Sequence, residues 1–154
     1  MIARALAASL ALLVAACSGI PRSQEESSSS SVGMLAAANA LKVVGTRYQY
    51  GGADPVSGFD CSGLVQFSYR EAGIALPRTT EAQRLASRLI QRTELQAGDL
   101  IFFDLESKKN SHVGIYAGDG SFVHAPSTGK DVRRDRLDAP YWKKRISETR
   151  RLAI

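Results

Sequence analysis

The sequence predicts an α+β domain in which N-terminal helices pack on a mostly antiparallel β-sheet. Apolar residues recur at helical spacing in the first part of the folded region. After Gly98 the pattern changes to short apolar runs and two-residue alternation, which indicates strands. Helices that precede the strands, rather than alternate with them, are typical of the α+β class. The 154 residues leave room for one such domain.

Three helices are expected first. The first is predicted by apolar residues spaced three and four apart, namely Met34, Ala37, Leu41 and Val44. The second starts after Asp60, which is a good N-cap, and ends before Gly73, which occupies a C-cap position. Thr79 or Thr80 can cap the third helix, which we expect to run to about Ile90.

The second half of the chain is expected to form strands. A short apolar run spans Leu100–Phe103, and residues alternate over His112–Ala117. Phe122–Ala125 follows a glycine-containing turn, and further strands are predicted at Val132 and over Tyr141–Ile146. Strands joined by short turns pair in an antiparallel manner, so the sheet should be mostly antiparallel.

The N-terminal residues are typical of an exported protein. Met1–Ala16 carries one positive charge and then an apolar stretch too short to span a bilayer, so we interpret it as a signal peptide. Val14-Ala15-Ala16-Cys17 resembles a bacterial lipobox, which implies that Cys17 receives diacylglycerol. Ser18 then implies an outer-membrane lipoprotein that faces the periplasm. The alternative is an ordinary cleavage site beside an incidental cysteine.

A Ser-rich segment separates this leader from the folded domain. Residues 17–32 contain the cysteine expected to be lipidated and few apolar side chains. Such a segment cannot bury enough surface to offset the entropy lost on ordering. We therefore expect a flexible tether over residues 17–32 and a folded domain over residues 33–154.

The formal net charge of +5 favours anionic partners. Anionic lipid headgroups, anionic cell-wall polymer and nucleic acid all fit such a charge, as does a role in solubility alone. No nucleic-acid recognition motif is visible in the sequence, so we expect no nucleic-acid partner.

The chain contains two cysteines, Cys17 and Cys61. If Cys17 is acylated, Cys61 is left as an unpaired thiol in an oxidising compartment. Such a thiol is either reactive or buried and inert, and the number of cysteines alone leaves both possibilities open.

Cys61 and the chain's two histidines can form the site of a cysteine peptidase. This chemistry needs a thiol, a base that removes its proton and a third group that orients the base. Cys61 lies in the first turn of the second predicted helix, where the helix dipole and free N–H groups lower the pKa of a thiol. His112 and His124 lie on neighbouring strands of one predicted hairpin. A half-buried structural role is the alternative for either histidine.

The length of the hairpin loop decides whether the two histidines meet. A two-residue turn would pair Ile115 with His124 and place His112 on the opposite face. A three-residue loop over Gly118-Asp119-Gly120 pairs Gly114 with His124 instead, so that both histidines share a face as diagonal neighbours. Such loops often close with a glycine in the left-handed conformation, which the last residue of this loop can supply. We therefore predict the three-residue loop.

Ordered sequence blocks carry a family resemblance. The blocks that include the cysteine and the histidines are Asp60-Cys61-Ser62-Gly63-Leu64-Val65, Ser111-His112-Val113-Gly114-Ile115-Tyr116 and Phe122-Val123-His124-Ala125. The other blocks are Tyr48-Gln49-Tyr50-Gly51-Gly52, Leu76-Pro77-Arg78-Thr79-Thr80, Gly98-Asp99-Leu100-Ile101-Phe102-Phe103 and Pro140-Tyr141-Trp142-Lys143-Lys144-Arg145. With these blocks the chain resembles the NlpC family of papain-like cell-wall peptidases, and its ending resembles the outer-membrane lipoprotein murein endopeptidases of Gram-negative bacteria. The resemblance implies a papain-like NlpC-type α+β fold.

The resemblance also implies roles for single residues. Cys61 is similar to the family's nucleophile and His112 to its general base. His124 occupies the third polar position, which orients the base. Tyr48, or Tyr50 as the alternative, resembles the tyrosine whose hydroxyl helps to hold the oxyanion.

The implied function is that of a peptidoglycan endopeptidase that cleaves stem-peptide amides near diaminopimelate and is attached to the membrane by its N-terminal lipid. Ser62 and Arg78 are candidates for substrate contacts, with a plain solvated arginine as the alternative for Arg78. Two histidines and one cysteine lack the spacing of a zinc site, so we expect neither metal nor cofactor. We also expect a monomer. The rival function is a catalytically silent lipoprotein that binds peptidoglycan.

Overall fold

The computed structural model describes residues 22–154, with side chains from residue 30 onward. The predicted signal peptide over residues 1–16 and the predicted lipidation site Cys17 lie outside the described residues. Within the described range the elements follow one another in this order: α1 (Arg22–Lys42), β1 (Ala53–Asp54), β2 (Gly58–Phe59), α2 (Cys61–Arg70), α3 (Thr80–Leu85), β3 (Ser87–Leu89), a 3-10 turn (Arg92–Glu94), β4 (Leu100–Leu105), β5 (Lys108–Tyr116), β6 (Ser121–His124), β7 (Arg133–Arg136), α4 (Pro140–Lys143) and β8 (Ile146–Leu152).

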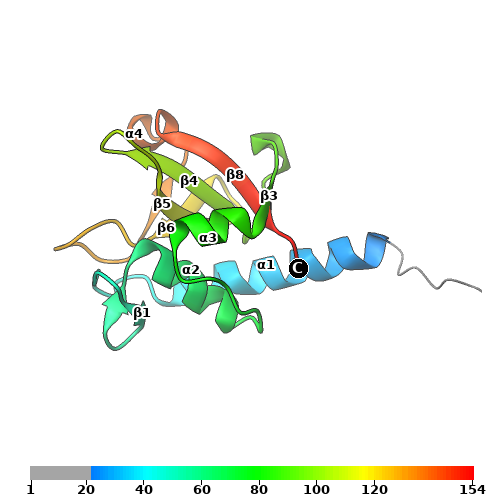
Figure 1. The fold of residues 1–154 in the computed structure, drawn as a ribbon, viewed down its shortest axis with the longest axis horizontal. Helices are drawn as coiled ribbons and strands as arrows, with labels where there is room; N and C mark the ends of the chain where they lie inside the picture. Colours follow the sequence, from blue (N-terminus) through cyan, green and yellow to red (C-terminus); the bar gives the residue numbers. More distant parts are fainter. Residues whose placement is uncertain (1–21) are drawn as a thin grey trace, which may run out of the picture.

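Six of these strands form one antiparallel sheet with the order β3-β8-β4-β5-β6-β7. In Figure 1, α1 and α2 lie together below the strands, and α4 lies above them. The short strands β1 and β2 pair with each other in the loop that leads into α2. The predicted α+β class, with N-terminal helices against a mostly antiparallel sheet, is confirmed.

The sheet buries both of its faces. The face toward α1 and α2 forms the main core, which contains Ala36, Ala40, Leu64, Val65, Leu100, Phe102, Val113 and Ile115. The opposite face carries a smaller, aromatic-rich cluster of Ile101, Phe103, Phe122, Leu137 and Trp142. Successive residues of β4 alternate between the two clusters, as strand geometry requires. Burial on both faces explains why the first four residues of β4, Leu100–Phe103, are all apolar.

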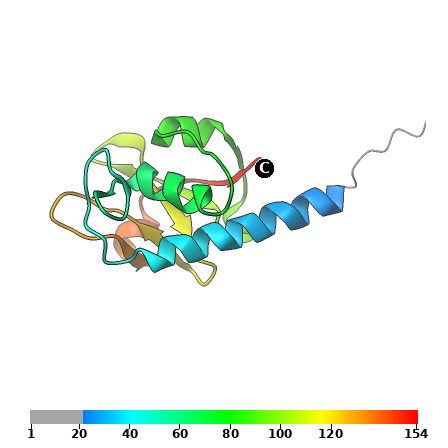
Figure 2. The same ribbon diagram turned by 90° about the horizontal axis from the view of Figure 1, so that it is seen from below.

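The first helix is longer than expected. The sequence predicted that the folded domain begins at residue 33, after a flexible tether. In the structure α1 begins at Arg22, inside the Ser-rich segment, and its N-terminal half extends away from the rest of the described molecule (Figure 2). Once the docked half of the helix has formed, each further residue adds a hydrogen bond without the cost of a new nucleus. No helix within residues 22–154 is long and apolar enough to cross a membrane.

Two later elements differ from the prediction. Thr79 caps α3, but the helix ends at Leu85 instead of continuing to about Ile90, and the chain goes on as β3, which pairs with β8. The segment Tyr141–Ile146 was predicted as a strand. In the structure its first residues belong to α4, and β8 begins only at Ile146, the last residue of the segment. Pro140 occupies the first helical position, where its fixed φ favours a helix start. This local preference outweighs the β-propensity of the aromatic residues that follow.

The hairpin between β5 and β6 has the predicted three-residue loop. Ile115 pairs with Val123, so Gly114 lies opposite His124 in the same register. Gly120 adopts a φ of 79°, the left-handed conformation expected at the end of such a loop. The prediction that both histidines share one face of the hairpin is therefore confirmed.

Candidate active site

Cys61 is the first residue of α2, and it is half-buried. Asp60 caps the helix, since its carboxylate accepts the Gly63 N–H at 2.7 Å. The Cys61 sulfur lies 3.8 Å from the Thr80 hydroxyl oxygen. It also interacts with the backbone N–H of Val113 on β5, one residue after the first histidine. The predicted position of the thiol in the first turn of the helix is confirmed, and the thiol lies beside the histidine-bearing strand.

The electrostatic environment of this thiol differs from the expectation. Burial raises the pKa of Cys61, while interactions with the Thr80 hydroxyl and the Val113 N–H act in the opposite direction without cancelling it. The helix N-terminus predicted a lowered pKa, but desolvation outweighs that contribution here. Cys61 is therefore a neutral thiol at neutral pH until a base removes its proton.

His112 and His124 contact each other in the interior. The distance from His112 Nε2 to His124 Nδ1 is 2.9 Å, and the two residues are only 3% and 0% exposed. His124 Nε2 lies 3.1 Å from Oδ2 of Asp135 on β7. The Trp142 ring packs against both imidazoles, with centroid distances of 5.9 Å and 4.8 Å. A continuous line of polar contacts thus runs from His112 through His124 to Asp135.

Both imidazoles are neutral at pH 7. Burial lowers the pKa of His112 to about 3, helped by the neighbouring His124 and by the charge of Arg133. Burial also lowers the pKa of His124 to about 4, although Asp135 acts in the opposite direction. A neutral imidazole is the form that can take a proton from a thiol.

Tyr48, rather than Tyr50, lies close to the thiol. The Tyr48 ring packs against the main core, and burial, together with the charges of Cys61 and Asp60, raises the pKa of its hydroxyl. This hydroxyl therefore stays protonated and able to donate a hydrogen bond at neutral pH. Tyr50 is 84% exposed. The placement favours Tyr48 as the candidate donor to an oxyanion.

Ser62 and Arg78 are held by each other and by Asp60. Two guanidinium nitrogens of Arg78 donate to the two carboxylate oxygens of Asp60, at 2.6 Å and 2.9 Å. Arg78 also donates to the Ser62 hydroxyl at 2.9 Å and to the Gly52 carbonyl at 3.2 Å. Asp60 is thus both a helix cap and an ion-pair partner. The two candidate substrate contacts form one cluster at the start of α2.

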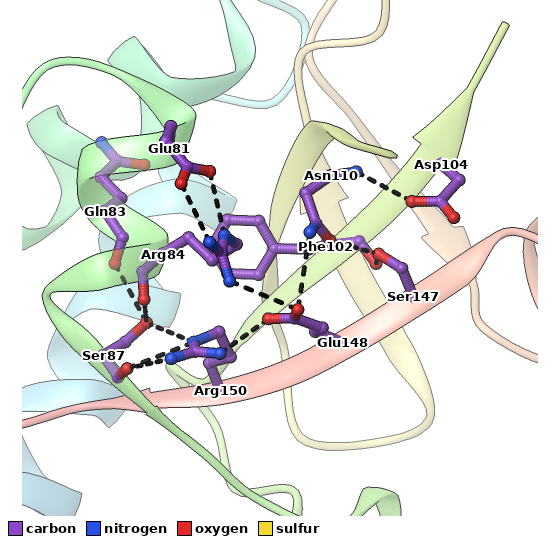
Figure 3. Close-up of polar contacts among 10 residues, drawn as sticks. All are labelled: Glu81, Gln83, Arg84, Ser87, Phe102, Asp104, Asn110, Ser147, Glu148 and Arg150. Carbon is purple, nitrogen blue, oxygen red and sulfur yellow. Dashed lines mark hydrogen bonds and ion pairs between the residues drawn. The ribbon is translucent and has the colours of Figure 1, made fainter. Parts of the chain in front are cut away.

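A polar network attaches α3 to the sheet (Figure 3). Glu148 of β8 accepts from Arg84 of α3 at 3.4 Å and from Arg150 at 2.7 Å. Arg150 in turn donates to the carbonyl of Ser87, which follows α3, at 2.5 Å. Because Thr80 is the first residue of α3, this network helps to fix its hydroxyl beside the thiol.

Three residues of the site were not predicted. Asp135 lies in an arginine-rich segment, and only the pairing of β6 with β7 brings it to the histidines. The connection between β6 and β7 is longer than the β5–β6 loop, and its length does not predict the register in which the two strands pair. Thr80 was expected only as a helix cap, and Trp142 only as part of the C-terminal block. Within residues 22–154, no group of three or more His, Cys, Asp or Glu side chains could hold a metal ion.

Comparison with known proteins shows the family of this chain. The model of the NlpC/P60 family matches residues 45–151, which include every residue of the candidate site from Tyr48 to Trp142. The chain belongs to the NlpC/P60 family. Its predicted resemblance to that family and its papain-like fold are thereby confirmed.

Relatives in this family share much of the domain. The bifunctional muramidase/DL-endopeptidase CwlT of Bacillus subtilis is 45% identical over 106 residues, which cover 68% of this chain and 32% of CwlT. The murein DD-endopeptidase MepS/murein LD-carboxypeptidase of Escherichia coli is 45% identical over 109 residues, covering 70% of this chain and 56% of the relative. An NLP/P60-family protein of Staphylococcus aureus, described as similar to lipoprotein, superposes with a TM-score of 0.70 at 37% identity, over 79% of this chain and 41% of that one. The chain thus spans about half, or less, of each of these proteins.

Proposed function

We propose that this chain is a cysteine endopeptidase that cleaves the peptide part of peptidoglycan, with Cys61 as its nucleophile. The observation that carries the proposal is the contact between the buried, neutral imidazoles of His112 on β5 and His124 on β6, with the Cys61 thiol beside β5. Acyl transfer needs a thiol, a base and a group that orients the base. A thiol beside β5 and the histidine pair on β5 and β6 supply these residue types. A fold that only binds peptidoglycan does not require a thiol in this position.

The mechanism begins with removal of the thiol proton by His112, after which the thiolate attacks an amide carbonyl carbon. The Tyr48 hydroxyl and the backbone N–H of Cys61 stabilise the tetrahedral oxyanion, since the first N–H groups of a helix have no intrahelical partner. Protonated His112 then gives its proton to the departing amine, which leaves an acyl thioester on Cys61. His112 next activates water, and hydrolysis of the thioester releases the acid and restores the thiol.

The substrate class is supported by the relatives. The name of one specifies a murein DD-endopeptidase, and that of another a DL-endopeptidase. We infer that the amide lies in the stem peptide near diaminopimelate. It is either the D-alanyl–diaminopimelate crosslink or the D-glutamyl–diaminopimelate bond. The net charge of +5 suits an anionic polymer as partner.

We also propose that the protein is attached to the outer membrane through lipid on Cys17. The support is the lipobox-like Val14-Ala15-Ala16-Cys17 at the end of an apolar leader. Several acyl chains together give the stable anchoring that one chain does not. Mass spectrometry of the N-terminal peptide from purified envelopes should show an acylated Cys17, and Cys17→Ala should abolish the modification and release the protein from the outer-membrane fraction. An unmodified Cys17 in the mature protein would contradict the anchor.

Digestion of diaminopimelate-type peptidoglycan, followed by mass spectrometry of the products, tests the activity. Monomers released from crosslinked dimers, or shortened stems, should form with the wild type and not with Cys61→Ala. The masses identify the bond. If the folded, reduced wild type releases no product and yet sediments with peptidoglycan, the protein is a binding lipoprotein instead.

A further inference from the structure

The carboxylate of Asp135 lies at the end of the histidine pair. Three side chains form hydrogen bonds with its Oδ2 atom. Trp142 Nε1 donates at 2.9 Å and Arg133 Nε at 3.0 Å, while His124 Nε2 lies at 3.1 Å. Burial acts to raise the pKa of Asp135, but the hydrogen bonds from His124 and Trp142, with the charge of Arg133, hold it below its ordinary value. Asp135 is therefore an ionised group that can only accept hydrogen bonds.

This restriction determines where the proton of each histidine lies. Because Asp135 only accepts, His124 must carry its proton on Nε2, and a neutral His124 then has an unprotonated Nδ1. His124 Nδ1 contacts His112 Nε2 at 2.9 Å, so the proton in that hydrogen bond must belong to His112. A neutral His112 is consequently unprotonated at Nδ1. Within the described part of the chain, no hydrogen bond to that nitrogen is present.

We propose that Asp135 is a positioning residue that sets the tautomer of His124 and, through it, that of His112. The role of Asp135 in catalysis rests on the proposed function. With this arrangement the basic nitrogen of His112 is Nδ1, and the Nε2 proton stays in the hydrogen bond to His124 throughout. When Nδ1 takes the proton of Cys61, the imidazolium keeps its donor to His124, and His124 keeps its donor to Asp135. No second proton has to move.

The surroundings hold Asp135 rigidly enough for this role. Trp142 donates to the carboxylate and also packs on both imidazoles, so the same side chain orients the acceptor and the rings. Arg133 lies next to this carboxylate oxygen and offsets its charge. The charge of Asp135 is therefore largely balanced locally, and its effect on His112 is expected to come through tautomer and orientation more than through attraction.

Nitrogen NMR of the full-length chain, labelled with 15N-histidine, tests the proposal directly. The chain contains only two histidines, so four ring nitrogens report on both tautomers, and His124→Gln assigns them. The wild type should show protonated Nε2 and unprotonated Nδ1 in both rings. The opposite tautomer in either ring would overturn the proposal without any variant at Asp135.

Three variants connect the tautomers to turnover. Asp135→Ala should give mixed tautomers and lower kcat by about 10- to 100-fold, with KM changed by less than about threefold. Asp135→Asn should largely keep the wild-type tautomers and the wild-type kcat. Trp142 and Arg133 hold the amide oxygen of the asparagine toward them, and hence toward His124. Asp138→Asn is the matched control: it removes the same charge from an exposed carboxylate that pairs with Arg136, and should change neither tautomers nor kcat.

The outcomes separate this inference from the proposed function. The inference is overturned if Asp135→Ala keeps the wild-type tautomers and the wild-type kcat. It is also overturned if Asp135→Asn keeps the wild-type tautomers but loses as much kcat as Asp135→Ala, because the charge of Asp135 would then be the cause of the loss. The NMR measurement needs no substrate. A wild type that leaves peptidoglycan uncut therefore refutes the proposed function, while the tautomer assignment is decided independently.

Discussion

Lowering the pH from 7 to 5 should destabilise this protein through its two buried histidines. Both are neutral in the folded state, where burial lowers the pKa of His112 from 6.5 to about 3 and that of His124 from 6.5 to about 4. The unfolded chain binds a proton at each imidazole once the pH falls below 6.5. Because the unfolded state then binds more protons, the free energy of unfolding falls as the pH falls.

The size of the effect follows from these values. A pH of 5 lies about 1.5 units below the pKa of each histidine in the unfolded chain and still above its pKa in the folded protein. Each histidine therefore lowers the free energy of unfolding by about 2 kcal/mol at this pH. At pH 7 the cost is close to zero, so the free energy of unfolding should drop by about 3–4 kcal/mol in total. The loss should continue toward the folded pKa values. The carboxyl of Asp119, whose pKa is lowered to about 2, contributes only at lower pH.

Urea unfolding at pH 7, 6 and 5, followed by fluorescence of the single Trp142, measures this slope. The double variant His112→Gln, His124→Gln should be nearly insensitive to pH over this range, and each single variant should lose about half of the slope. A wild-type free energy of unfolding that is constant between pH 7 and 5 would refute the reasoning. So would a double variant that retains the full slope.

Two further pairs of variants test the site and the fold. Tyr48→Phe removes a proposed oxyanion donor and should lower kcat by about 100-fold, whereas Tyr50→Phe should change it by less than about threefold; equal losses would contradict the assignment. Gly98→Ala should destabilise the fold far more than Gly73→Ala in chemical denaturation. Both glycines have positive φ, 98° and 89°, but an added Cβ at Gly98 would lie 2.3 Å from Gly33 on α1, while Gly73 has nothing within 4 Å. Equal destabilisation would show that backbone strain alone matters there.

Much of the candidate site could be predicted because its signals are local. Asp60 caps the helix that begins with Cys61, and both features are visible in adjacent residues. The loop over residues 118–120 sets the register of one hairpin, and with it the meeting of His112 and His124. In each case a rule of backbone geometry over a few residues was sufficient.

The features that were missed depend on contacts between distant segments. Asp135 reaches His124 only through the pairing of β6 with β7, whose connection has no diagnostic length. The third helix ends early because the following residues pair with β8 at the far end of the chain. The raised pKa of Cys61 reflects its burial, which the helix position alone did not indicate. The extension of α1 to Arg22 follows from helix propagation, to which composition gave no clue.

Hydrolysis of a purified, crosslinked muropeptide dimer by the wild type and by Cys61→Ser tests the central claim most directly. The two proteins differ by a single atom, and circular dichroism establishes that both are folded. The account predicts that the wild type cleaves a stem-peptide amide and that Cys61→Ser is slower by about 1,000-fold or more. Cleavage by Cys61→Ser at the wild-type rate would contradict Cys61 as the nucleophile.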